Sequence, residues 1–511
     1  MPYRFRPLFL ALVLWMPASL ALAQTVTFTK VADTGTPIPG GTGTFGSPLP
    51  FQGVALDEGT VAFSASGQND QEGVYAWSGG ALRRVADGST LMPTNGQPLE
   101  FFGGPSSDDG RIVFTGYTSF IGQEGIFRDT AGSLQLVVGP NTSVPGGSGN
   151  FNSFGPSVAL HGNDLVFIGG VQDFFGTHSQ QGVYALLSGS LVRIADLNTT
   201  IPGGTTHFNG FRQVGFDGST IAFSVPIPAT TADQAIYRYA NGTLTRVVDT
   251  NTPVPGGTGS FFNIGNFCVD GGNVTFIGIG SNAEFGIYEA DASGTLRVIA
   301  DRSTVAPGGS QTFNQFYTLS CSDGNVAFTA ATNAINPVGL YKEINGRFVK
   351  VLRTGDTLDG KTVESLSLSQ ESMDGSEIAF KVEFTDSTDG LYVAAVGCQP
   401  TPTRLCLNGG RFAVTTTWET PQGQSGVGNA IQLTADTGYF WFFNQENVEV
   451  VVKVLNACSR GRYWVFASGL TNVEVELRVE DTLTGEVRTY TNPQRTAFQP
   501  IQDTSAFATC P

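Results

Sequence analysis

The chain has 511 residues, including 66 Gly and 38 Phe, and its 43 acidic residues against 27 basic ones give a formal net charge of −16. This excess of negative charge argues against nucleic acids and anionic membranes as partners, because both are negatively charged. Beyond the first 23 residues no stretch is apolar enough to cross a bilayer, so we expect no membrane insertion.

The first 23 residues have the pattern of a secretory signal peptide. Arg4 and Arg6 precede an apolar run from Pro7 to Leu20, and a small-residue Ala-Leu-Ala sequence ends at Ala23. Such a segment is removed on export and is too short for a membrane span. We therefore expect cleavage after Ala23 and a secreted or periplasmic protein. Residue 24 is Gln and not Cys, so we expect no lipid anchor.

A short motif organises the chain up to residue 397. It reads VADTGTPIPGG from Val31 to Gly41, and variants recur at intervals of 52 to 57 residues. The variants begin at Val85, Val137, Ile194, Val247, Ile299 and Val351. Repeats of this length are typical of β-propeller blades.

Each repeat contains the signals of four strands, which we name a to d. Strand a follows the Pro-Gly-Gly, strand b ends in a triplet such as Val61-Ala-Phe63, strand c carries a triplet such as Gly73-Val-Tyr75, and strand d leads into the next motif. Short runs of β-branched and aromatic residues between Gly, Asp, Asn and Ser indicate strands. Seven copies predict an all-β, seven-bladed β-propeller over residues 24–397.

The two ends of the repeat region complement each other. The seventh repeat ends with strand c, Gly390 to Val396, while residues 25–33 form a strand d with no blade before it. We expect the N-terminal strand to close the last blade, which leaves no long unpaired edge.

The turns predict two unlike faces. The a–b and c–d turns are short Asp-Gly and Asn-Gly hairpins, such as Asp270-Gly271 and Asn241-Gly242, and define a tight-turn face. The d–a and b–c loops are longer and more variable, and define a long-loop face. A ligand is expected on the long-loop face.

The longest b–c loop, residues 169–181, is the least repeat-like segment. Its Phe174, Phe175 and His178 are candidates for a ligand-binding edge together with His207 of the following d–a loop. In the alternative interpretation the two Phe side chains only cover the blade and the histidines have no role. His161 falls on the opposite face, so the three histidines do not form one metal site and zinc is disfavoured.

An Asp recurs at the start of the d–a loop. It is found at Asp33, Asp87, Asp196, Asp249 and Asp301. These carboxylates form either a metal-binding or catalytic ring, or caps of their own turns. We favour caps, because catalysis needs unlike groups at one point. We assign no catalytic residue and no cofactor, leave calcium open as a ligand of the ring, and find no hydrolase, phosphate-loop or dinucleotide motif.

The six cysteines are expected to be oxidised in an exported protein. Cys268 and Cys321 occupy equivalent positions in adjacent repeats, which predicts a disulfide between blades, with two buried thiols as the alternative. Cys398, Cys406, Cys458 and Cys510 lie beyond the repeats and allow three pairings that sequence does not resolve. We favour Cys398 with Cys406 and Cys458 with Cys510.

The composition changes after a Pro/Thr linker at residues 398–403. Residues 404–511 alternate in the manner of short strands, for example from Arg411 to Trp418, and predict a β-sandwich. The run from Tyr439 to Phe443 is either an aromatic sugar-binding platform or a strand that sends about half of its rings into the core. We favour the strand.

Two resemblances extend this interpretation. The strings LCLNGGRFAVTTTW, DTGYFWFFNQENVEVVVKVLNAC and GRYWVFASGLTNVEVELRVEDTLTGEVRTYTNP resemble a C-terminal module of many secreted bacterial proteins. This resemblance implies attachment, stabilisation or surface display rather than chemistry. The repeats loosely resemble TolB-type and other secreted bacterial β-propellers over about residues 25–397, a resemblance that brings no catalytic residues to carry over.

The sequence favours an exported bacterial binding or scaffold protein, expected to be a monomer, that recognises an extracellular glycan or protein through the long-loop face. An extracellular polysaccharide lyase or hydrolase with its site in the propeller funnel is the second hypothesis. A structural surface or matrix component is the third.

Overall fold

The computed structural model of the chain describes residues 26–46, 50–68, 71–118, 123–172, 178–226, 233–332, 337–344 and 346–510. These residues form an all-β, propeller-like protein whose strands fall into nine antiparallel sheets. No α-helix, and therefore no helix able to span a membrane, occurs in the described ranges.

Seven sheets follow one another along residues 26–396. The first contains β2 (Gln52–Asp57), β3 (Thr60–Ser66), β4 (Glu72–Ser78) and β5 (Ala81–Asp87). The second contains β6 (Phe101–Phe102), β7 (Ser106–Asp108), β8 (Arg111–Tyr117), β9 (Glu124–Thr130) and β10 (Ser133–Val138). The third contains β11 (Ser153–His161), β12 (Asp164–Gln172), β13 (His178–Leu187) and β14 (Ser190–Asp196). The fourth contains β15 (Val214–Phe216), β16 (Thr220–Pro226), β17 (Asp233–Ala240) and β18 (Thr243–Asp249).

The remaining three have the same order. The fifth contains β19 (Phe261–Asp270), β20 (Asn273–Gly280), β21 (Phe285–Ala290) and β22 (Leu296–Asp301). The sixth contains β23 (Gln315–Ser322), β24 (Asn325–Ala331), β25 (Val338–Ile344) and β26 (Arg347–Arg353). The seventh contains β27 (Thr357–Leu358), β28 (Lys361–Ser367), β29 (Met373–Asp374), β30 (Glu377–Phe384), β31 (Asp389–Val396) and, at its outer edge, β1 (Val26–Asp33).

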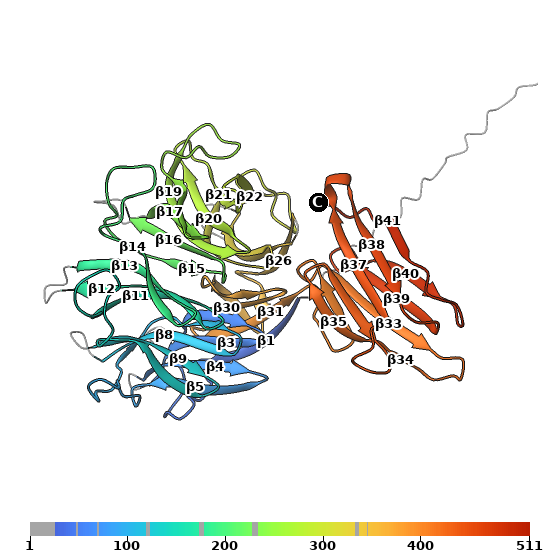
Figure 1. The fold of residues 1–511 in the computed structure, drawn as a ribbon, viewed down its shortest axis with the longest axis horizontal. Helices are drawn as coiled ribbons and strands as arrows, with labels where there is room; N and C mark the ends of the chain where they lie inside the picture. Colours follow the sequence, from blue (N-terminus) through green and yellow to red (C-terminus); the bar gives the residue numbers. More distant parts are fainter. Residues whose placement is uncertain are drawn as a thin grey trace, which may run out of the picture.

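The seven sheets form a closed cycle. The inner strands contact one another in the order β2, β7, β11, β15, β19, β23 and β29, and β29 returns to β2. The N-terminal strand completes the seventh sheet, because β1 pairs with β31 from Val26↔Val396 to Asp33↔Gly390. The first and last strands of the repeat region therefore lie together, as expected from the sequence (Figure 1).

The repeated aromatic residues form the core between the sheets. The Phe after each Pro-Gly-Gly meets the Tyr of strand c edge-on, with 5.0 Å between the ring centroids of Phe45 and Tyr75 and 4.9 Å between those of Phe151 and Tyr184. Gly73 is needed beside this pair, because a Cβ there would lie 2.6 Å from the carbonyl oxygen of Ala86. The sequence repeat is thus a packing repeat.

Side chains at the tight turns join neighbouring sheets at most positions around the ring. The Asp57 carboxylate accepts the backbone N–H of Asp109 at 2.7 Å, and that of Asp270 accepts the N–H of Gly324 at 2.7 Å. Asp217 and Asp374 do the same for Gly272 and Glu58. Basic side chains on strand c reach the carbonyl of the following turn at 2.6 Å (Arg128 to Asn163), 3.0 Å (Arg238 to Gly272) and 2.7 Å (Lys342 to Gly375). The sequence predicts these turns as hairpins, but it does not predict that their side chains form hydrogen bonds with the neighbouring sheet.

Two five-stranded sheets make up the C-terminal part. One contains β32 (Leu405–Leu407), β33 (Phe412–Glu419), β34 (Ser425–Val427), β39 (Glu474–Asp481) and β40 (Glu486–Asn492). The other contains β35 (Asn429–Thr434), β36 (Thr437–Trp441), β37 (Val450–Ala457), β38 (Arg462–Gly469) and β41 (Ile501–Phe507), with a 3-10 turn, η2 (Cys458–Arg460), between β37 and β38. They share one apolar core. Phe440 and Phe442 are buried while Phe443 is half exposed, so the run of aromatic rings is divided between core and surface.

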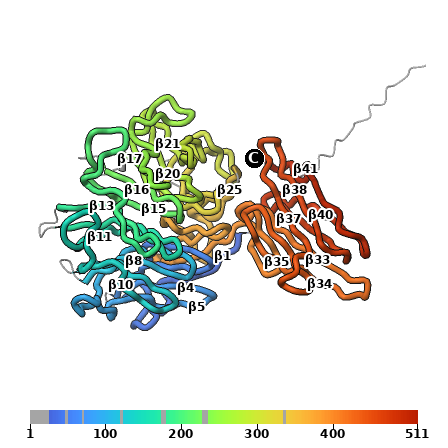
Figure 2. Tube along the Cα trace, viewed as in Figure 1, coloured from blue at the N-terminus to red at the C-terminus, as the bar shows by residue number. Residues whose placement is uncertain are grey.

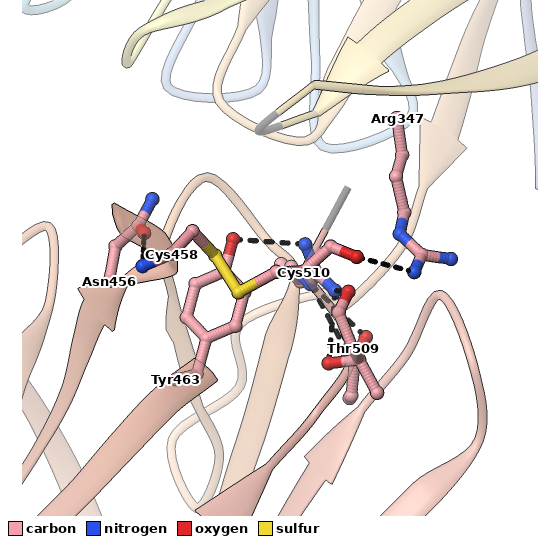
Figure 3. Close-up of a disulfide and its surroundings, with 8 residues drawn as sticks. Arg347, Asn456, Cys458, Tyr463, Thr509 and Cys510 are labelled. Carbon is pink, nitrogen blue, oxygen red and sulfur yellow. Dashed lines mark hydrogen bonds and ion pairs between the residues drawn. A yellow bond between two sulfur atoms is a disulfide. The ribbon is translucent and has the colours of Figure 1, made fainter. Parts of the chain in front are cut away.

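A buried arginine holds the C-terminal segment in this core. Arg411 and Asp481 are both fully buried and form an ion pair of 2.9 Å, and the Arg411 guanidinium also donates to the Tyr463 hydroxyl at 2.9 Å and to Thr509. One residue further, the carbonyl of Cys510 accepts a 3.1 Å hydrogen bond from Arg347 of β26 (Figure 3). The same segment therefore ties the C-terminal part to the repeat region, and the two lie side by side (Figure 2).

The structure has three disulfides. They join Cys268 to Cys321, Cys398 to Cys406 and Cys458 to Cys510, and no free cysteine remains. These are the pairings expected from the sequence. The first links the inner strands β19 and β23 of adjacent sheets.

Candidate functional site

The predicted ligand-binding edge is only partly described. Phe174, Phe175 and the side chain of His178 lie outside the described residues. His207 is exposed in a d–a loop, where it forms a β-bridge with Thr200. His161 ends β11 and lies 3.5 Å from the Asp108 carboxylate, at the tight turns.

The recurrent Asp residues cap their own loops. Asp33 accepts hydrogen bonds from the Gly35 N–H and the Thr36 hydroxyl, both at 2.9 Å. Asp196, Asp249 and Asp301 make the equivalent bonds two and three residues ahead, and Asp87 accepts both the N–H and the hydroxyl of Ser89, two residues ahead. Each of these carboxylates therefore caps its own turn, as the capping interpretation predicts. Among the described residues no three His, Cys, Asp or Glu side chains are placed to hold a metal ion.

The d–a loops are also held from the side. Gln71, just before strand c, accepts the Thr42 N–H at 3.1 Å and donates to the Thr42 carbonyl at 2.6 Å. Gln180 binds Ser148 in the same way, and Glu284 accepts the Thr258 N–H. These d–a loops are therefore held in place by side chains at the start of strand c.

A cavity of about 560 Å³ opens where the inner strands begin, and we call it the mouth cavity. Six of the seven sheets contribute to it, which places it at the centre of the ring. The lining consists of Gly53, Val54, Gly104, Pro105, Pro156, Ser157, Val158, Phe211, Arg212, Gln213, Asn266, Ser369, Gln370 and Glu371. Apolar walls with amide and hydroxyl groups are typical of a small-molecule site.

The floor of the mouth cavity comes from the seventh sheet. The chain leaves β28 at Ser367 and resumes in β29 at Met373, and the residues between them enter the ring. The Gln370 amide donates to the Val214 carbonyl at 3.0 Å and accepts from Gln213 at 2.7 Å, both from the fourth sheet. Gln370 thus links the seventh sheet to the fourth sheet across the centre of the ring.

Gln370 and Glu371 also line a second cavity of about 220 Å³ at the tight turns. Its walls carry carboxylates, and burial together with neighbouring carboxylates raises the pKa of Asp57 to about 6 and the pKa values of Asp270 and Asp374 above their usual range. Because these carboxylates accept the N–H groups that join the sheets, this end has a structural role.

Glu371 is the most perturbed acid in the two cavities. Burial raises the pKa of its carboxyl group to about 8, opposed by a hydrogen bond from Ser106 and assisted by the negative charges of Asp108 and Asp57. This shift favours the protonated, neutral form of the Glu371 carboxyl group. The sequence reasoning missed it, and the only available signal was the polar run SLSQESM, which no other repeat contains.

Three aromatic side chains are exposed near the outer ends of inner strands. They are Phe101 on β6, Phe262 on β19 and Tyr317 on β23, with exposed fractions of 46%, 61% and 40%. The pairing register of β19 shifts around Phe262 and that of β23 shifts around Tyr317. A bulge turns a side chain out of the sheet, which accounts for the exposure of these two rings.

The chain matches one family model and several solved structures. The model describes a family of unknown function (DUF7453) and matches residues 20–405. No curated protein matches the chain. The β-propeller domain of the Trilobed protease from Pyrococcus furiosus is 13% identical with a TM-score of 0.41, over 68% of this chain and 95% of that one.

Two further structures are similar at the same low level. An oligogalacturonate lyase in complex with manganese is 16% identical with a TM-score of 0.40, over 73% of this chain and 98% of that one. The SapL1 lectin in complex with alpha methyl fucoside is 9% identical with a TM-score of 0.32, over 60% of this chain and 96% of that one. At such scores these structures indicate neither a ligand nor a reaction for this chain.

Proposed function

We propose that this chain, which belongs to the family of unknown function DUF7453, is an exported binding protein that recognises an extracellular ligand through its long-loop face. A glycan is the favoured ligand, and a protein is the alternative. The observation that carries the proposal is the mouth cavity, whose lining offers amide and hydroxyl groups beside apolar walls. Sugars present hydroxyl groups at their edges and C–H groups on their faces, so they need both kinds of contact.

The exposed rings of Phe262 and Tyr317 support a ligand larger than the cavity. Both rings project from the inner strands toward solvent on the long-loop side, where successive sugar units would stack on them. Phe174, Phe175, His178 and His207 remain proposed members of the same binding face.

The proposal includes a specific architecture. The seven sheets would be the seven blades of a propeller over residues 24–397, preceded by a signal peptide at 1–23 and followed by a linker at 398–403 and a β-sandwich at 404–511. The family match ends at residue 405, so the resemblance of the C-terminal module to a secreted appendage stays a prediction. Three disulfides are consistent with export to an oxidising compartment.

A polysaccharide-active enzyme is the second candidate, and Glu371 is the observation that favours it. A carboxyl group that keeps its proton at neutral pH can act as a general acid. No catalytic partner is assigned, and binding remains the better-supported function.

The test is a glycan array with the protein from Gln24 onward, followed by titration of the strongest glycan. The double variant Phe262→Ala/Tyr317→Ala should bind at least about fivefold more weakly, because it removes two stacking surfaces. Phe443→Ala is the matched control, since it removes an equally exposed ring from the C-terminal part. Loss of binding in the control alone would move the site to that part, and no binding to any glycan would contradict the proposal.

A further inference from the structure

The C-terminal sheet that contains β35 to β38 has an apolar outer side. Phe440 of β36, Val452 of β37 and Val465 of β38 enter the core of the C-terminal part. Successive side chains of a strand point to opposite sides of a sheet, so the residues between them lie on the outer side. We call this set the aromatic face, and it consists of Tyr439, Trp441, Val451, Leu455, Trp464 and Phe466. All are partly exposed, and none belongs to or packs against an apolar core of the described residues.

The aromatic face forms one band across the sheet. Leu455 pairs with Trp464, and Val451 pairs with Tyr439 two rows further along the strands. Trp441 follows one row later, so the band from Trp464 to Trp441 is about 20 Å long, because each row of two residues advances about 6.8 Å. A surface of this length suits an extended chain of several units better than one small molecule.

The polar atoms of these rings point to solvent. Among the described residues, the Tyr439 hydroxyl and the indole N–H groups of Trp441 and Trp464 make no hydrogen bond, and they are not buried. A Tyr or Trp that only fills a core normally has a partner for its polar atom. Here each ring can stack on an apolar surface while its polar atom binds a hydroxyl group of the same ligand.

The two outer sides of the C-terminal part differ in charge. Strands β35 to β38 contain no Asp or Glu, and their charged side chains are Lys453 and Arg462. The outer side of the other sheet carries four glutamates on β33 and β39, which are Glu419, Glu474, Glu476 and Glu480. In a chain with a net charge of −16, a side that has cations and no strand carboxylate is complementary to an anionic partner.

Arg460 of η2 is placed at one end of the aromatic face to bind a carboxylate. Its exposed guanidinium lies over the Trp464 ring, 5.8 Å from the ring centroid. A stacked guanidinium keeps its fork of N–H groups available for a bidentate carboxylate. Lys453 already pairs with Asp436 at 2.7 Å, whereas no ion pair joins Arg460 to an acid in the part of the chain that the structure describes. Arg460 is therefore the cation available to a ligand.

We propose that the aromatic face binds an extended acidic polysaccharide, whose sugar rings stack on Tyr439, Trp441 and Trp464 and whose carboxylates pair with Arg460. Charges are screened over about 8 Å at physiological ionic strength, so the local cations govern this contact more than the net charge does. A second copy that met the face with its own would bring Arg460 and Arg462 against the same cations. The site is separate from the mouth cavity and does not depend on it.

The test is calorimetric titration of the protein from Gln24 onward with alginate, a polyuronate, and with the same polymer after esterification of its carboxylates. Alginate should bind at least about tenfold more tightly than the ester, because the ester cannot form the charged hydrogen bonds. Trp441→Ala/Trp464→Ala should weaken alginate binding at least about fivefold, because two stacking surfaces are lost. Arg460→Gln, at an exposed position, should weaken it about threefold and reduce its dependence on salt.

Two controls separate this site from the others. Phe443→Ala removes an exposed ring of the C-terminal part outside the aromatic face, and Phe262→Ala/Tyr317→Ala removes the rings beside the mouth cavity. Both should keep the wild-type affinity for alginate. Circular dichroism of each variant should match the wild type, which shows that lost binding is not lost folding.

Each other outcome would overturn the inference. Equal binding of alginate and its ester would remove the acidic ligand, and alginate binding lost only in Phe262→Ala/Tyr317→Ala would move the site to the mouth cavity. A dimer in sedimentation that Trp441→Ala/Trp464→Ala dissociates would assign the face to a second copy. Binding to phosphatidylglycerol vesicles without binding to alginate would assign it to a membrane. A protein that binds no alginate contradicts this inference and leaves the mouth cavity to the glycan array.

Discussion

Arg411→Leu is the substitution with the most clearly derived cost. The Arg411 and Asp481 side chains are both 0% exposed, and the guanidinium also binds Tyr463 and Thr509. Removing the arginine leaves the Asp481 carboxylate buried without its counter-charge, which typically costs about 3–5 kcal/mol of unfolding free energy. Because the arginine also fixes Thr509 beside Cys510, the contact of Cys510 with Arg347 should loosen as well.

A double variant isolates the electrostatic part of this cost. Arg411→Leu/Asp481→Leu removes both charges and should recover most of the loss, because apolar residues often replace a buried ion pair without penalty. Urea unfolding followed by Trp fluorescence is a suitable assay, since Trp418, Trp441 and Trp464 all lie in the C-terminal part. A single variant within about 1 kcal/mol of the wild type, or a double variant no better than the single one, would refute the reasoning.

Three further predictions concern the repeat region. Burial raises the pKa values of Glu371, Glu124 and Asp57 to about 8, 7 and 6, so between pH 5 and pH 7 the folded protein holds protons that the unfolded chain has lost, and the unfolding free energy should fall by several kcal/mol over this range. Urea unfolding at both pH values measures this, and a flat or rising profile would contradict it. Asp270→Ala should lower the unfolding free energy by about 1–2 kcal/mol, because the Gly324 N–H loses its acceptor. Asp270→Asn keeps an acceptor and should leave the unfolding free energy nearly unchanged. Equal losses for the two variants in chemical denaturation would be evidence against the inter-sheet hydrogen bond. Replacing both Cys268 and Cys321 by Ser removes a disulfide with a sequence separation of 53 and should lower the unfolding free energy by about 4 kcal/mol. The same change at Cys398 and Cys406, with a separation of 8, should lower it by about 2.5 kcal/mol. Thermal unfolding should show the larger destabilisation in the first double variant, and the reverse order would count against a chain-entropy origin.

The architecture could be predicted from the sequence because the same packing contacts recur in successive repeats. Phe45 and Tyr75 pack together in the first repeat, and the same contact recurs in later repeats, so the spacing of these residues in the sequence reflects their packing in the structure. The pairing of β1 with β31 followed from counting strands at the two ends. The bonds from Asp57 and Asp270 to the next sheet were not predicted, because an Asp-Gly turn looks the same whether or not its carboxylate binds a neighbour.

The candidate site was located less completely. The long-loop face was chosen because its loops vary, and the mouth cavity does open at that end of the inner strands. Glu371 and Gln370 could not be identified, because their importance comes from a break in one inner strand and from residues far apart in sequence, such as Val214. Exposure of Phe262 and Tyr317 depends on local register shifts that a pattern of apolar residues does not encode.

The central claim, that a ligand binds at the mouth cavity, is tested most directly by hydrogen–deuterium exchange of the full mature protein with and without the strongest glycan from the array. Binding there should slow exchange in residues 211–215, 262–267 and 368–372, which line or border the cavity. Protection confined to the tight turns around Asp57 and Asp108, or to the C-terminal sheets, would contradict the account.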